Sequence, residues 1–194
     1  MNRIVIGLVA FILGIGLGGI GGFFVGAAST DFGGELLKSA FSSEKAADVA
    51  NPKSISRTHF TLQFPGNWKE DPSFDVGGDQ HFFLLKSEAG SYASFQVQNE
   101  ASNTQDVVEE NVALESEGLS QITKTPFSKW GQYQGTGVEI KGRALGYYSS
   151  RVRIFSYSSN NKSFLVIEQH YNEDSALTTP GFQLIERTFK LKNP

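Results

Sequence analysis

The chain has 194 residues, among them 20 acidic residues and 17 Lys or Arg residues, and its formal net charge is −3 at pH 7. This balance argues against nucleic acid as the main partner, because neutralising phosphates requires an excess of Lys and Arg. The sequence contains no Cys, which excludes disulfides, thiolate chemistry, Cys-ligated metals and a lipid attached to a Cys.

The first 28 residues predict a transmembrane anchor. No charged residue lies between Arg3 and Asp31, and residues 4–28 would form a helix about 37 Å long, against about 30 Å of hydrocarbon. A cleaved signal peptide and a buried core helix are the alternatives, but the apolar run is longer than that of a signal peptide and has no polar face. Arg3 precedes the span and acidic residues follow it, which predicts a cytoplasmic N-terminus and an extracytoplasmic (periplasmic or equivalent) domain.

Glycines recur at four-residue spacing inside this anchor. They are Gly14, Gly18, Gly22 and Gly26. Such a row exposes a backbone groove against which another helix can pack closely, although glycine is also simply common in membrane helices. The pattern predicts helix–helix packing, either with an integral membrane protein complex or with a second copy of the chain.

Residues 29–56 have the composition of a linker, rich in Ser, Ala and Gly. Within them, Phe32, Leu36, Leu37, Ala40 and Phe41 have the spacing of a short amphipathic helix. This helix could lie on membrane lipid, or it could pack against its own domain or a partner.

Residues 57–194 predict one soluble α+β domain, with an antiparallel sheet of about six strands and helices packed on it. Alternating or continuous apolar residues indicate strands, while a 3.6-residue period indicates a helix at 104–118. The pair Thr179-Pro180 predicts the start of a closing helix. The strands are expected at residues 57–64, 80–86, 92–98, 120–128, 136–143, 147–157 and 162–171, the last in the centre of the sheet.

The strands at 136–143 and 147–157 predict a hairpin. Pairing about Leu145 would set Val138 opposite Val152 and Glu139 opposite Arg151. Four basic residues would then share one outward face: Lys141, Arg143, Arg151 and Arg153. This face could be a docking patch for an acidic partner or anionic lipid head groups, or an ordinary solvated sheet face.

Other groups of polar residues give weaker indications of a metal-binding or catalytic site. Asp75, Asp79 and His81 could ligate a divalent cation, but their spacing matches no metal motif, so no metal site is predicted. Neither a nucleophile elbow nor a phosphate-binding or dinucleotide-binding glycine loop is present. We therefore expect no catalytic residue and no cofactor.

The order of elements resembles the PsbP-like (Mog/PsbP/DcrB-type) fold. The resemblance is carried by the sequence FTLQFPGNW at residues 60–68, the mid-domain helix, the long meander and a closing helix that ends in RTF at residues 187–189. It implies a non-enzymatic binding or accessory subunit, often docked on a membrane complex, and transfers no functional residue. DcrB-type relatives are anchored through a lipidated Cys, which this chain lacks.

The sequence thus favours a membrane-anchored accessory subunit or assembly factor of a larger membrane complex. A self-oligomerising membrane protein is one alternative. A tethered domain that binds a small or lipid-like ligand between sheet and helix is the other.

Overall fold

A computed structural model describes residues 43–71, 80–144, 148–159 and 161–192, with only the backbone of Gln80 and His81. The predicted anchor with its glycine row, the predicted amphipathic segment at 32–41, and Asp75 and Asp79 lie outside these residues. Within the described ranges, no helix is both long and apolar enough to cross a membrane.

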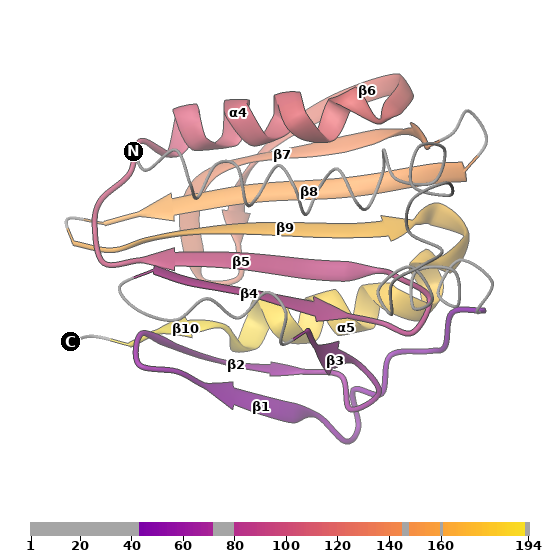
Figure 1. The fold of residues 1–194 in the computed structure, drawn as a ribbon, viewed down its shortest axis with the longest axis horizontal. Coiled ribbons are helices and arrows are strands. Elements are labelled where there is room, and N and C mark those ends of the chain that lie inside the picture. The colour runs from indigo at the N-terminus through magenta and orange to yellow at the C-terminus, as the bar shows by residue number, and fades with distance from the viewer. Residues whose placement is uncertain (1–42, 72–79, 145–147, 160, 193–194) are drawn as a thin grey trace, which may run out of the picture.

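The described chain builds one large sheet in which every neighbouring pair of strands is antiparallel (Figure 1). The predicted α+β class with an antiparallel sheet is confirmed, with seven strands in this sheet among the described residues. In spatial order they are β3 (Lys69–Glu70), β4 (Gln80–Lys86), β5 (Tyr92–Gln98), β9 (Ser163–Tyr171), β8 (Tyr148–Ser158), β7 (Tyr133–Ala144) and β6 (Leu119–Trp130). As predicted, the strand that is apolar on both faces, β9, lies in the middle.

A second, three-stranded sheet was not predicted. It consists of β1 (Lys53–Ser56), β2 (Phe60–Phe64) and β10 (Lys190–Leu191), with β2 in the centre. The strand expected at 57–64 therefore belongs to this small sheet rather than to the main one. Because β1 lies at the end of the predicted linker, ordered structure begins before residue 57.

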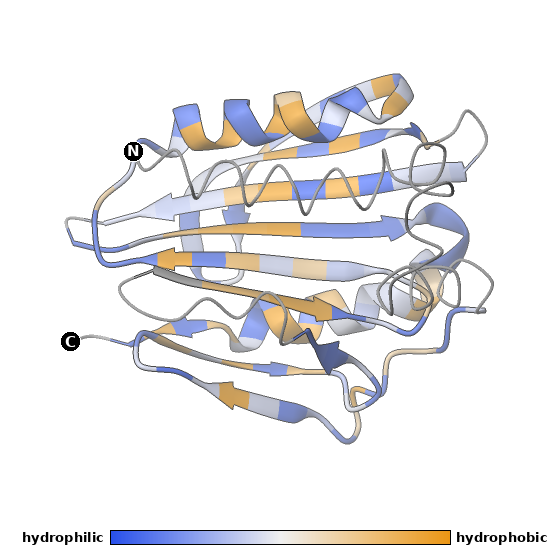
Figure 2. Cartoon of the chain, in the orientation of Figure 1, coloured by the Kyte–Doolittle hydropathy of each residue, from blue (hydrophilic) through white to orange (hydrophobic). Residues whose placement is uncertain are grey.

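The two faces of the main sheet carry different helices. Helix α4 (Thr104–Glu117) packs on β6, β7 and β8, and α5 (Ser175–Thr188) packs on β9 and on β2 of the small sheet. Hydrophobic and hydrophilic residues are interspersed along the helices and strands (Figure 2), and the buried hydrophobic ones form two cores. The larger core joins the main sheet, α5 and the small sheet through stacked rings, with Phe60 on Phe83 at 4.8 Å and Phe83 on Phe95 at 4.7 Å between centroids.

Local signals explain both helices. The Asn103 side chain accepts a hydrogen bond from the Gln105 amide and caps α4, which begins at the predicted residue 104 and ends one residue before the predicted 118. In contrast, α5 begins at Ser175 instead of Thr179, so Pro180 lies inside the helix and one backbone hydrogen bond is lost. The predicted start was wrong because a 3₁₀ turn at Asn172–Asp174 leads directly into the helix.

The predicted register of the β7–β8 hairpin was wrong by two residues. Val138 pairs with Ile154 and Glu139 with Arg153, because the strands are joined about residue 146 instead of 145. An even shift leaves every side chain on its predicted face. The shift turns the expected direct pair of Glu139 and Arg151 into a diagonal one, which the long Arg side chain still reaches.

Candidate functional site

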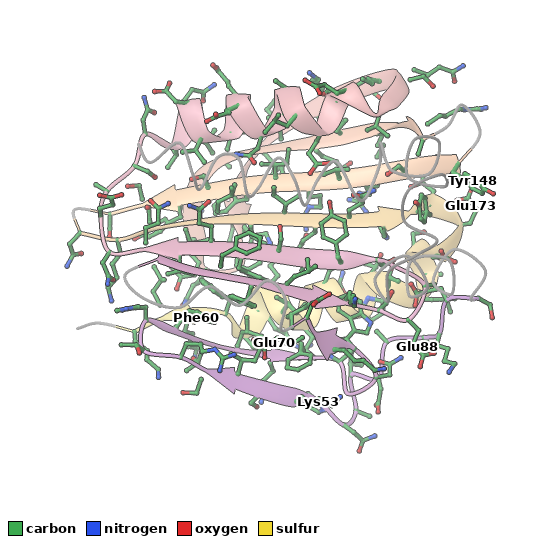
Figure 3. All side chains as sticks on the ribbon, viewed as in Figure 1. Lys53, Phe60, Glu70, Glu88, Tyr148 and Glu173 are labelled. Atoms are coloured by element: carbon green, nitrogen blue, oxygen red, sulfur yellow. The ribbon has the colours of Figure 1, made fainter. Side chains whose placement is uncertain are left out.

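The basic residues predicted from the hairpin lie together on the α5 side of the main sheet. Lys141 is the direct cross-strand neighbour of Arg151, and Arg143 and Arg153 follow at alternate positions on the same two strands. This is the end of the sheet where β8 begins and α5 starts, marked in Figure 3 by Tyr148 and Glu173. We call these four residues the basic face.

Glu139 partly neutralises the basic face. Its carboxylate accepts a hydrogen bond from Arg151 Nε at 2.8 Å and lies 3.2 Å from Lys141 Nζ. Partial burial alone would raise the pKa of Glu139, but hydrogen bonds from Arg151 and Lys141 hold it below its ordinary value. Two cations thus share one carboxylate, and Arg143 adds an exposed third cation.

Arg153 has a different environment, because two carboxylates share its guanidinium. Arg153 Nη1 donates to Glu168 Oε2 at 2.9 Å and to Glu186 Oε2 at 3.2 Å. Its guanidinium carbon also lies 4.9 Å from the centre of the Phe127 ring. Burial would lower the pKa of Arg153, but the two carboxylates raise it above its ordinary value. This side chain ties β8 to β9 and α5.

Glu168 is a buried carboxyl with two donors. Trp130 Nε1 donates to its Oε1 at 3.1 Å, and Arg153 occupies its other oxygen. Burial raises the pKa of Glu168 to about 7, against the opposing effect of Arg153. Glu168 therefore takes up a proton much nearer to neutral pH than an ordinary Glu does.

At neutral pH, His170 is an uncharged imidazole that can accept a hydrogen bond. Thr178 Oγ1 donates its only proton to the Asp174 carbonyl at 3.0 Å, so the 2.9 Å contact with His170 Nδ1 requires the ring to donate. Burial, followed by the neighbouring Arg151, lowers the pKa of His170 to about 4. At neutral pH the imidazole is therefore uncharged, with an unprotonated Nε2.

These groups surround a cavity of about 290 Å³ between the main sheet and α5. Its lining includes Arg151 and Arg153 from β8, Glu168 and His170 from β9, and Phe182 and Glu186 from α5. The structure thus brings Arg151 and Arg153 to a cavity, while Lys141 and Arg143 do not line it.

The β6–β7 turn fixes the position of Glu186. The Gly131 amide donates to Glu186 Oε1 at 2.9 Å. Gly131 has a φ of +56°, and a Cβ there would lie 2.3 Å from the Glu186 carbonyl oxygen. Only glycine fits this close approach in this conformation.

Gly131→Ala is expected to lower the free energy of unfolding by about 1–3 kcal/mol, because it combines an unfavourable φ with a backbone clash. Urea denaturation followed by Trp fluorescence measures the change. Gln132→Ala, at an exposed position in the same turn, is the matched control and should change stability by less than about 0.5 kcal/mol. Equal stability of the two variants would contradict this view of the turn.

A second buried carboxyl, Glu115, lies on the buried face of α4. It is 0% exposed, and neither of its oxygens has a hydrogen bond of ordinary geometry among the described residues. Burial raises the pKa of Glu115 to about 8, although the nearby hydroxyl of Tyr92 opposes the shift. Glu115 is therefore largely a neutral acid at pH 7.

Sequence reasoning missed Glu168, Glu186 and Trp130. One signal was present, because Glu168 directly follows the apolar run Phe164–Ile167 in a strand predicted to be central, where a charge requires a partner. The predicted cation cluster at Asp75, Asp79 and His81 lies outside the described side chains. Among the side chains that are described, no group of three or more His, Asp or Glu could hold a metal ion.

No protein-family model and no curated protein matches the sequence. Three solved structures show what the chain resembles. A protein from Bacteroides thetaiotaomicron is 13% identical with a TM-score of 0.48, and the match covers 73% of this chain but only 48% of that protein. Cyanobacterial PsbP (CyanoP) from Synechocystis is 10% identical with a TM-score of 0.49, covering 78% of this chain and 99% of that one. LpqN, involved in cell envelope biogenesis of Mycobacterium tuberculosis, is 9% identical with a TM-score of 0.44, covering 74% and 91%.

A PsbP protein is thus among the similar structures. At these identities the likeness concerns the fold alone.

Proposed function

We propose that this protein is a non-enzymatic accessory subunit or assembly factor of a membrane protein complex. Residues 1–28 would anchor it, packing their glycine row on a helix of that complex. The domain would then lie on the extracytoplasmic side and dock through the basic face on an acidic surface of the partner.

One observation carries the docking proposal: Lys141 and Arg151 share the single carboxylate of Glu139, and Arg143 adds a third, exposed cation on the same face. The side chain of Lys141 is 56% exposed and that of Arg151 is 31% exposed, whereas their shared partner Glu139 is only 15% exposed. Among the strands, the most extensive contacts of α5 are with β2 and β9, and Lys141 and Arg143 of the hairpin lie at exposed positions. Carboxylates of a partner would pair with the exposed side chains of Lys141 and Arg151, because the carboxylate of Glu139 that shares them is less exposed.

The double variant Lys141→Glu/Arg143→Glu is expected to reduce the recovery of the partner complex at least roughly tenfold, because opposed like charges cost several kcal/mol at an interface. The measurement is affinity purification of the full-length chain from its native membrane, with the partner quantified by mass spectrometry. Both positions are exposed, so the fold should be retained.

Arg187→Glu/Lys190→Glu is the matched control, since it makes the same change of charge at exposed positions on α5 and β10. It should leave recovery unchanged. If both double variants recover the partner equally well, the basic face is not the docking surface.

The cavity supports a second candidate function, the binding of a small ligand between the sheet and α5. Its volume of about 290 Å³ is at the lower end of the range for small-molecule sites, and charged, polar and aromatic side chains line it together. Native mass spectrometry of the full-length protein, purified gently from its own membrane, would detect a retained small molecule. Its loss in a variant that fills the cavity, Phe182→Trp, would locate it.

A further inference from the structure

The two ends of the cavity differ in their balance of charge. At Arg151, two cations face one carboxylate, because Lys141 also pairs with Glu139. At Arg153, two carboxylates face one cation, Glu168 at 2.9 Å and Glu186 at 3.2 Å. The cavity therefore has a surplus of positive charge towards the hairpin and a surplus of negative charge towards α5.

His170, directly across from Arg151, and Phe182 add a polar group and an apolar surface to the cavity. His170 lines the cavity as a neutral ring whose Nε2 has no proton, and the ring of Phe182 contacts it edge-on with centroids 5.5 Å apart. An apolar segment can rest on Phe182, while Nε2 can accept one hydrogen bond from a ligand N–H or O–H.

We propose that the cavity binds a small zwitterion, a molecule with one carboxylate and one ammonium group such as an amino acid, with its carboxylate at Arg151 and its ammonium at Glu186 and Glu168. This inference rests on the ligand-binding function proposed above and names the class of ligand. A bidentate carboxylate suits the guanidinium of Arg151, and the ammonium would relieve the repulsion between two carboxylates that share one cation.

Proton balance gives this site a characteristic pH dependence. Near pH 7 a proton on Glu168 partly offsets the negative surplus, because burial raises the pKa of that carboxyl to about 7. A bound ammonium would displace this proton. Affinity for a zwitterion should therefore rise between pH 6 and pH 8, whereas affinity for a simple carboxylate should not rise.

The test is calorimetric titration of the full-length chain in mild detergent at pH 8. The probes are ω-amino acids from glycine to 6-aminohexanoate, each compared with the carboxylic acid and the amine of the same carbon number. At least one amino acid should bind roughly tenfold more tightly than both of its matched compounds, which corresponds to about 1.4 kcal/mol. The proposal is overturned if no amino acid binds, or if every amino acid that binds is equalled by its matched carboxylic acid.

Glu186→Gln should abolish the preference for the amino acid over the acid, while Arg187→Gln, at the next and exposed position, should retain it. Unchanged preference in Glu186→Gln would place the ammonium elsewhere and contradict the assignment. Because Glu186→Gln leaves Lys141 and Arg143 intact, recovery of the partner complex should be normal in this variant. Binding of a ligand that is not zwitterionic would leave the ligand-binding function standing and refute only the class of ligand.

Discussion

Arg153→Met is expected to destabilise the domain by about 3–5 kcal/mol at pH 8, as found when one partner of a buried ion pair is removed. The variant retains much of the apolar stem of Arg153 but leaves Glu168, whose side chain is 4% exposed, without its cation. Glu186 loses the same partner. Urea denaturation followed by Trp fluorescence measures the effect in the full-length chain.

The destabilisation by Arg153→Met should be smaller at pH 6 than at pH 8, because Glu168 can then become protonated and neutral. Adding Glu168→Gln to Arg153→Met should recover part of the loss at pH 8, since a neutral amide replaces the unpaired carboxylate. Arg187→Met removes an exposed cation from α5 and serves as the control, with an expected change below about 0.5 kcal/mol. A loss below about 1 kcal/mol in Arg153→Met would show that the ion pair contributes little.

The free energy of unfolding is expected to fall by up to about 2 kcal/mol between pH 6.5 and pH 8, mainly through Glu115. The folded-state pKa of Glu115 is about 8, above its ordinary value of 4.5, so the folded protein retains a proton that the unfolded chain has already lost. The stabilisation that this proton represents is complete below pH 4.5 and is lost as the pH rises through 8, at about 1.4 kcal/mol per pH unit at most.

The choice of pH window separates Glu115 from the other buried groups. Burial lowers the pKa of His170 to about 4, so the titration of His170 raises stability as the pH rises through the ordinary value of 6.5 and opposes the effect of Glu115 weakly, in the lower part of the window. Glu168, with a pKa of about 7, contributes in the same direction as Glu115 but only in the lower part of the window. Urea midpoints at pH 6.5, 7.25 and 8 should therefore fall steadily for the natural chain and much less for Glu115→Gln. Parallel slopes for the two proteins would mean that Glu115 is ionised throughout.

Much of the main sheet could be predicted from the sequence, because burial on one or both faces leaves a readable pattern. The run Phe82 to Leu85 and the alternation in residues 92–98 gave β4 and β5 their bounds. The small sheet could not be predicted, because β10 has two residues and β1 four, too few to show a period. β2 belongs to the small sheet because it pairs with β1 and β10. These two short strands lie beside β2 only in the folded chain.

The basic face could be predicted because it depends on alternation along two adjacent strands. The carboxylates that pair with the basic face could be predicted less well. Glu139 lies on the same hairpin, but Glu186 reaches Arg153 from a helix 33 residues later in the chain. Trp130 likewise meets Glu168 across 38 residues. Such contacts are set by how α5 and the β6–β7 turn pack on the sheet, which no local pattern records.

Docking through the basic face can be tested most directly by site-specific photocrosslinking in the native membrane. A photoreactive amino acid replaces Arg143 on the basic face in one full-length chain, and Arg187 on α5 in another. We expect a single membrane-complex subunit to be crosslinked from position 143 and not from position 187. Crosslinking of that subunit from both positions alike, or recovery of the chain only as an uncrosslinked 21.2 kDa species from position 143, would contradict docking through this face.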